Sequence, residues 1–130
     1  GLRAGRRAAG GGGARAGRAQ EVRGNMMDGV VVRGGADPVV AGNRVTANRG
    51  NGVYVFEDGL GTFEENDVGE NESSGVVIRS GGNPTLRRNK VHHSKKNGIY
   101  VYMGGRGVLE DNEVFENRSD GISVKSNGQR

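Results

Sequence analysis

The hydrophobic residues of this chain recur in short, evenly spaced groups. Each group begins with a glycine and continues with three residues, of which the first and the third are always aliphatic. Alternation of an aliphatic residue with a variable one is the period of a β-strand. No group extends to the roughly 10–12 residues of a typical helix. The glycines that open these groups recur with a constant 23-residue period, at Gly29, Gly52, Gly75, Gly98 and Gly121.

Asparagines follow the same 23-residue period. They occupy two fixed positions of the repeat, where we expect bends, because asparagine tolerates the left-handed backbone conformation. Side-chain amides that stack from unit to unit can hydrogen-bond to one another. We therefore interpret them as structural. The first ladder comprises Asn43, Asn66, Asn89 and Asn112, and the second comprises Asn48, Asn71 and Asn117, with Ser94 at its third position.

A 23-residue repeat of short strands and tight turns is typical of one coil of a parallel β-helix. We predict an all-β fold, a single-stranded parallel β-helix whose coils stack at about 4.8 Å. The general hand of parallel crossovers makes it right-handed. Because its first and last coils are incomplete, we expect the solenoid to be truncated at both ends.

The chain consists of two segments that differ in composition. Residues 1–19 contain only Gly, Ala, Arg and one Leu, and such a low-complexity composition cannot form a core. We expect this segment to be disordered. Val22 and Asn25 already occupy positions of the repeat, so the predicted β-helix domain covers residues 20–130.

Composition excludes several classes of protein. Glycine supplies 26 of the 130 residues and hydrophobic residues only 32%, which disfavours a helical bundle. No apolar run approaches the roughly 20 residues of a membrane span, so no membrane partner is expected. Cysteine is absent, which removes disulfides and thiolate metal sites. We expect no metal and no cofactor.

Charge adds a second period of two coils. Residues 52–74 carry seven acidic and no basic residues, and residues 75–97 carry six basic and no acidic residues. Opposite charges in neighbouring coils attract each other and disfavour a slip of register. The net charge of +4 equals that of residues 1–28 alone. No basic stripe therefore runs along the repeats, and a nucleic-acid partner is disfavoured.

Candidate catalytic groups are few. Stacking places Glu64 and Glu110 two coils apart, at about 9.6 Å, with Arg87 between them. Charge alternation explains these carboxylates better than acid–base catalysis does. His92 and His93 are the only histidines, and the position of His93 between acidic residues suggests a plain electrostatic contact. We assign no catalytic residue, and a non-catalytic protein is favoured over an enzyme.

The outward positions of the first strand of each coil are the best candidate for binding. Aromatic and basic side chains gather there, and both types are enriched at protein interfaces. The same residues would also stabilise the fold through cation–π contacts, and aromatic rings over a sheet suit sugar rings. One expected exposed row contains Val31, Tyr54, Val77 and Tyr100, and the next contains Arg33, Phe56, Arg79, Tyr102 and Lys125.

Three phrases of the repeat support a resemblance to a known family. They are Gly-Gly-Asn-Pro-Thr-Leu-Arg-Arg-Asn-Lys-Val-His over 81–92, Asn-Gly-Ile-Tyr-Val over 97–101, and Gly-Val-Leu-Glu-Asp-Asn-Glu-Val-Phe-Glu-Asn over 107–117. Together they resemble the F-box-only proteins, the branch with right-handed parallel β-helix repeats.

This resemblance covers residues 20–130 and implies a function. It implies an intracellular protein, in cytoplasm or nucleus, that recruits a substrate protein to a ubiquitin ligase. The F-box itself does not occur in this sequence. Similar repeats occur in polysaccharide lyases and epimerases, so a β-helix that binds or cleaves uronate polymers is the alternative.

Overall fold

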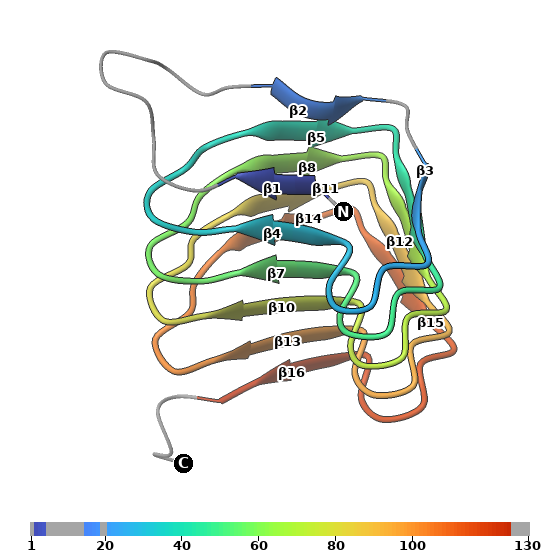
Figure 1. Cartoon of the computed structure of the whole chain (residues 1–130). Coiled ribbons are helices and arrows are strands. Elements are labelled where there is room, and N and C mark those ends of the chain that lie inside the picture. Colours follow the sequence, from blue (N-terminus) through green and yellow to red (C-terminus); the bar gives the residue numbers. More distant parts are fainter. Residues whose placement is uncertain (1, 5–14, 19–20, 126–130) are drawn as a thin grey trace.

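The computed structural model describes residues 2–4, 15–18 and 21–125, and every regular element in them is a β-strand (Figure 1). Three parallel sheets result, here named A, B and C. Sheet A contains β1 (Leu2–Ala4), β4 (Val30–Val32), β7 (Val53–Val55), β10 (Val76–Arg79), β13 (Ile99–Tyr102) and β16 (Ile122–Val124). Sheet B contains β2 (Arg15–Arg18), β5 (Val39–Ala41), β8 (Thr62–Glu64), β11 (Thr85–Arg87) and β14 (Val108–Glu110). Sheet C contains β3 (Glu21–Arg23), β6 (Arg44–Thr46), β9 (Asp67–Gly69), β12 (Lys90–His92) and β15 (Glu113–Phe115).

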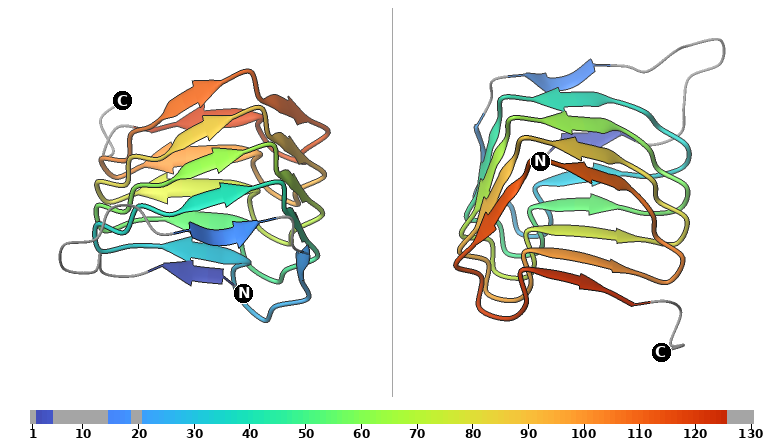
Figure 2. Two further views of the ribbon diagram at one scale, coloured as in Figure 1. Left: turned by 90° about the horizontal axis from the view of Figure 1, so that it is seen from above. Right: turned by 180° about the vertical axis from the view of Figure 1, so that it is seen from behind.

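The chain visits sheets A, B and C in turn and then returns to A, so each circuit is one coil (Figure 2). Equivalent residues of successive coils pair in register, as Val53 pairs with Val76 and Phe63 with Leu86. The predicted parallel β-helix of 23-residue coils is thereby confirmed. The described residues contain no helix, and so none that could cross a membrane.

The core lies inside the coils and contains aliphatic residues from all three sheets. Val55, Ile78, Leu86 and Val91 are at most 1% exposed. Strand alternation directs these side chains inward, as the sequence pattern predicts. The equivalent residues of β16 differ, because no described coil stacks beyond them: Ile122 is 50% and Val124 69% exposed.

The repeated glycine opens each strand of sheet A where a side chain would not fit. A Cβ atom at Gly52 would lie 2.5 Å from Cγ1 of Val68 and 2.7 Å from the backbone oxygen of Gly75. The second of these atoms belongs to the backbone and cannot rotate away. This clash explains why glycine recurs at this position of the repeat.

The first asparagine ladder runs along the bend between sheets B and C. The Nδ2 group of Asn66 donates to Oδ1 of Asn89 at 2.9 Å and to the backbone oxygen of Val40 at 3.0 Å. Oδ1 of Asn66 accepts the backbone N–H of Asn43 at 2.9 Å. Each amide thus satisfies buried backbone groups of a neighbouring coil, and the predicted ladder is confirmed.

The left-handed residues of these bends are not the asparagines, as the sequence suggested, but the residues that precede them. Gly42, Glu65, Arg88 and Asp111 have φ values from 55° to 68°. Both the backbone N–H and the side chain of an asparagine such as Asn66 form hydrogen bonds to neighbouring coils. The sharp turn therefore falls on the residue before it.

Two described segments differ from the expected disorder of residues 1–19. Strand β1 pairs with β4, and β2 pairs with β5. Strands β4 and β5 present backbone donors and acceptors on the side away from β7 and β8, and a strand of any composition can pair with these groups. Residues 1, 5–14, 19–20 and 126–130 lie outside the described residues.

Candidate binding face

The outer face of sheet A carries two stacked pairs of aromatic rings. Strand alternation places Tyr54 and Phe56 on one side of the sheet, and their ring centroids lie 4.6 Å apart with an interplanar angle of 17°. Two coils further on, Tyr100 and Tyr102 stack in the same way, at 4.5 Å and 17°. The rings of each pair stand side by side along one strand.

Basic side chains occupy the coils between and beside these pairs. The guanidinium of Arg79 lies 5.6 Å from the ring centroid of Tyr54 and 5.7 Å from that of Phe56. Arg33 approaches Phe56 from the preceding coil at 5.4 Å. Nζ of Lys125 lies 5.9 Å from the centroid of Tyr100. The seven candidate residues of this face are therefore brought together, aromatic coils alternating with cationic coils.

Two residues of the expected exposed row are in fact buried. Val31 is 6% and Val77 5% exposed. Both point out of the sheet, but Val77 pairs with Tyr54 on one side and with Tyr100 on the other. These larger side chains enclose the valine, so the row is not flat but hollowed at Val77.

This hollow is a groove of about 250 Å³. Val77 lies between Tyr54 on one side and Tyr100 with Tyr102 on the other. The bends that precede the strands of sheet A form the edge of the groove. The residues of this edge are Asn51, Ser73, Ser74, Lys96 and Asn97.

This edge was not among the predicted binding residues, although the same 23-residue period marks it. Asn51, Ser74 and Asn97 each stand immediately before a repeated glycine. Oδ1 of Asn51 accepts the backbone N–H of Ser74 at 2.9 Å, and Oγ of Ser74 accepts that of Asn97 at 3.2 Å. A third polar ladder therefore holds the edge in place.

Burial changes the ionisation of Tyr54. Desolvation of its hydroxyl raises the pKa of Tyr54 above the ordinary value, while the nearby guanidinium of Arg79 opposes this change. The phenol is therefore neutral at physiological pH. None of the residues that line the groove is acidic, and Lys96 gives its edge a positive charge, while the carboxylate of Asp28 acts on Tyr54 and helps to raise its pKa.

The carboxylates considered for catalysis belong to ion pairs on sheet B. Nη1 of Arg87 lies 3.3 Å from Glu64, and Nε lies 2.9 Å from Glu110. The hydrogen bond from Arg87 to Glu110 is the main cause that raises the pKa of Arg87. The predicted alternation of charge is thus a chain of contacts, and Arg87 occupies the space between the two carboxylates.

The two histidines form a hydrogen-bonded chain on sheet C. Nε2 of His92 lies 2.6 Å from Oδ1 of Asp67, and its Nδ1 lies 2.7 Å from Nδ1 of His93. Nε2 of His93 lies 3.4 Å from Glu116, the contact expected for it. Both nitrogens of His92 are therefore engaged, which leaves that ring no free nitrogen for a substrate.

The contact with Asp67 was missed because it is diagonal. His92 pairs in register with Gly69, not with Asp67. The absence of a side chain at Gly69 makes room for the ring, since a Cβ there would lie 2.5 Å from Cε1 of His92. The described residues contain no group of three or more His, Cys, Asp or Glu side chains arranged to hold a metal ion.

Comparison with known families gives one match. The family model for the right-handed beta helix region matches residues 19–130. The chain belongs to this family. The right-handed β-helix confirms the predicted hand and the repeat part of the resemblance, and it is compatible with a scaffold or binding role. The F-box assignment stays a prediction. No curated protein and no solved structure matches the chain.

Proposed function

We propose that this β-helix is a non-catalytic scaffold that presents the outer face of sheet A to a protein partner. The groove at Val77 carries the proposal, because it is a concave site between two stacked aromatic pairs, with an apolar floor at Val77 and a polar edge. Protein interfaces use aromatic and Arg side chains around such pockets. The stacked coils provide a rigid support, since every strand of the face pairs with its neighbours.

The resemblance to F-box-only proteins specifies the partner further. On that basis the partner is a substrate protein of a ubiquitin ligase, bound within the cytoplasm or nucleus. The carbohydrate alternative rests on the amide and hydroxyl groups of Asn51, Ser73 and Asn97 beside the tyrosines of the groove. Uronate binding is therefore a competing outcome of the test.

A photo-crosslinking amino acid placed on two faces tests the proposal. Replacement of Tyr100 with p-benzoylphenylalanine places the probe at the groove. The same replacement at Lys90, an exposed residue of β12 on sheet C, is the matched control. In extracts of the native cells, we expect a discrete protein adduct from position 100 and none from position 90.

A second substitution ties the adduct to the groove. Val77→Phe fills the groove with a bulky apolar side chain and should abolish the adduct from position 100. Equal adducts from both positions would contradict the proposal. So would the loss of the position-100 adduct when millimolar trigalacturonate is present during irradiation.

A further inference from the structure

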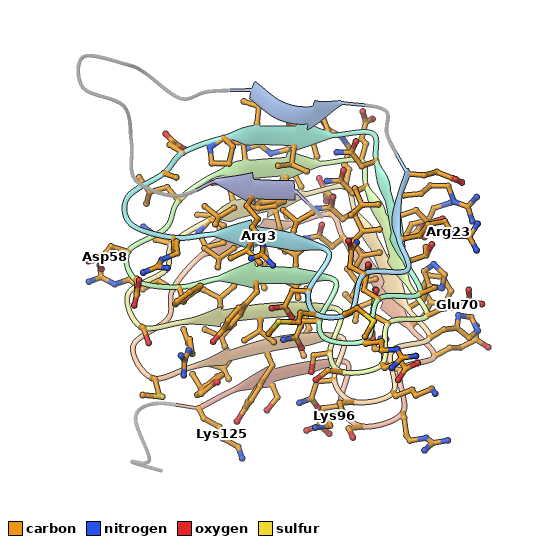
Figure 3. The ribbon with its side chains drawn as sticks, viewed as in Figure 1. Arg3, Arg23, Asp58, Glu70, Lys96 and Lys125 are labelled. Carbon is orange, nitrogen blue, oxygen red and sulfur yellow. The ribbon has the colours of Figure 1, made fainter. Side chains whose placement is uncertain are left out.

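We propose that the groove binds one apolar side chain of an acidic protein segment, whose carboxylates contact Arg79, Lys96 and Lys125. This inference rests on the proposed function, that sheet A binds a protein, and adds the chemistry of the partner. Figure 3 shows Lys96 and Lys125 in the last coils of the solenoid, Lys96 on the side where the strands of sheet A begin and Lys125 toward the side where β16 ends. Strand β10 contributes Arg79 next to Val77, the apolar side chain of the groove.

The size of the groove favours a single anchoring side chain. Its volume of about 250 Å³ lies below the range of about 300–1,000 Å³ that is typical of sites for small molecules and cofactors. One aliphatic side chain on Val77, between the rings of Tyr54 and Tyr100, would use this space. Anchors of this kind supply most of the binding energy of protein interfaces.

The charge of the face favours an acidic segment around that anchor. The two outward rows of sheet A contain Arg3 beside Val31, and Arg33, Arg79 and Lys125 at or just after the ends of their strands, and they contain no acidic residue. Arg33 is compensated by Glu57, at 2.7 Å. For Arg79, Lys96 and Lys125, the described part of the chain supplies no carboxylate within 4.0 Å. Their charges are therefore not neutralised by these residues and can attract acidic groups of a partner, although Nε of Arg79 is buried and its Nη1 contacts Sδ of Met103 at 4.0 Å.

The aromatic rings hold one of these cations in place. The guanidinium of Arg79 contacts the faces of both Tyr54 and Phe56, at 5.6 and 5.7 Å from the ring centroids. A stacked guanidinium keeps its N–H groups in the plane of the group, where carboxylates bind. Ordering Arg79 on binding therefore costs less entropy than ordering a free side chain.

Nuclear magnetic resonance titration with defined peptides tests the inference. The probe is the acetylated pentapeptide Glu-Asp-Leu-Asp-Glu, added to the intact chain at about physiological ionic strength. We expect shift changes at the amides of Val77, Lys96 and Tyr100. The peptide Glu-Asp-Gly-Asp-Glu, which lacks the anchor, should bind roughly tenfold more weakly. The basic peptide Lys-Arg-Leu-Arg-Lys should not bind.

Two adjacent lysines provide a matched pair of variants. Lys95 and Lys96 are both exposed in the same bend, but only Lys96 lines the groove. Lys96→Glu should weaken binding of the acidic peptide roughly three- to tenfold, and Lys95→Glu less than twofold. Because the two changes are equal in charge, a difference between them reports position and not net charge.

The remaining outcomes separate this inference from the proposed function. Equal binding of the basic and acidic peptides, equal effects of both lysine variants, or no peptide binding at millimolar concentration would each overturn the inference. If one of these results occurs and position 100 still gives a groove-dependent adduct, this inference fails. The proposal that sheet A binds a protein then stands. Trigalacturonate that shifts the same amides, without any such adduct, would overturn both proposals.

Discussion

The outer faces of sheets A and B follow the same two-coil alternation with different chemistry. On sheet B, Glu64, Arg87 and Glu110 satisfy one another directly, at 3.3 and 2.9 Å. On sheet A, cations alternate with aromatic rings, as where Arg79 lies over Tyr54 and Phe56. An ion pair engages the N–H donors of arginine, whereas a ring contact leaves them available. The carboxylates of sheet B therefore neutralise Arg87, whereas no carboxylate of the described chain forms an ion pair with Arg79 on sheet A.

The largest expected effect comes from the ladder beneath both faces. Asn66→Ala removes an amide that is 4% exposed and leaves the backbone oxygen of Val40 and the N–H of Asn43 without this partner. The free energy of unfolding should fall by about 3 kcal/mol, measured by urea denaturation. Asn112→Ala, in the partly exposed fourth position of the ladder, is the milder control.

Substitution of one arginine on each face tests this difference between sheets A and B. Arg79→Gln should weaken binding of the acidic pentapeptide roughly three- to tenfold, because it removes a donor beside the groove. Arg87→Gln should leave that affinity unchanged and lower the stability by at most about 1 kcal/mol, less at high salt. Equal losses of affinity in both variants would show that only the overall charge matters.

A gap in the second ladder allows a stabilising change. Ser94 stands where Asn48, Asn71 and Asn117 supply amides, and its buried hydroxyl has no hydrogen-bond partner in the described structure. Ser94→Asn should restore the bonds to the adjacent coils and raise the free energy of unfolding by about 1 kcal/mol. Thermal denaturation measures this gain, and Ser119→Asn, at an exposed position, is the control.

The smallest effect concerns the phenol of Tyr54. Burial raises the pKa of Tyr54 in the folded state above the ordinary value of 10.0. The stabilisation that the neutral phenol provides is therefore complete below pH 10.0. It is lost as the pH rises through the pKa of Tyr54 in the folded protein. Absorbance at the phenolate band should show a late-ionising component that Tyr54→Phe removes. Arg79→Gln should move this component to still higher pH, and a shift to lower pH would contradict the assigned cause.

The repeat alone was sufficient to predict the backbone architecture. Residues one period apart become neighbours in the sheets, so the inward positions of Val55 and Ile78 and the ladder of Asn66 and Asn89 followed from the period. This prediction succeeds because every coil repeats the same local environment, and an error in one coil would disagree with the others. The sequence pattern did not predict strands β1 and β2, because backbone pairing needs no hydrophobic pattern.

Contacts that do not follow the 23-residue register were decided only by the tertiary structure. The sequence identified the aromatic and basic positions of sheet A, but the burial of Val77 depends on how its larger neighbours enclose it. The diagonal contact of His92 with Asp67 depends on the space above Gly69. A period determines which residues stack. The packed coils determine the direction and reach of the side chains, and they also determine the bends that bring Lys96 to the groove.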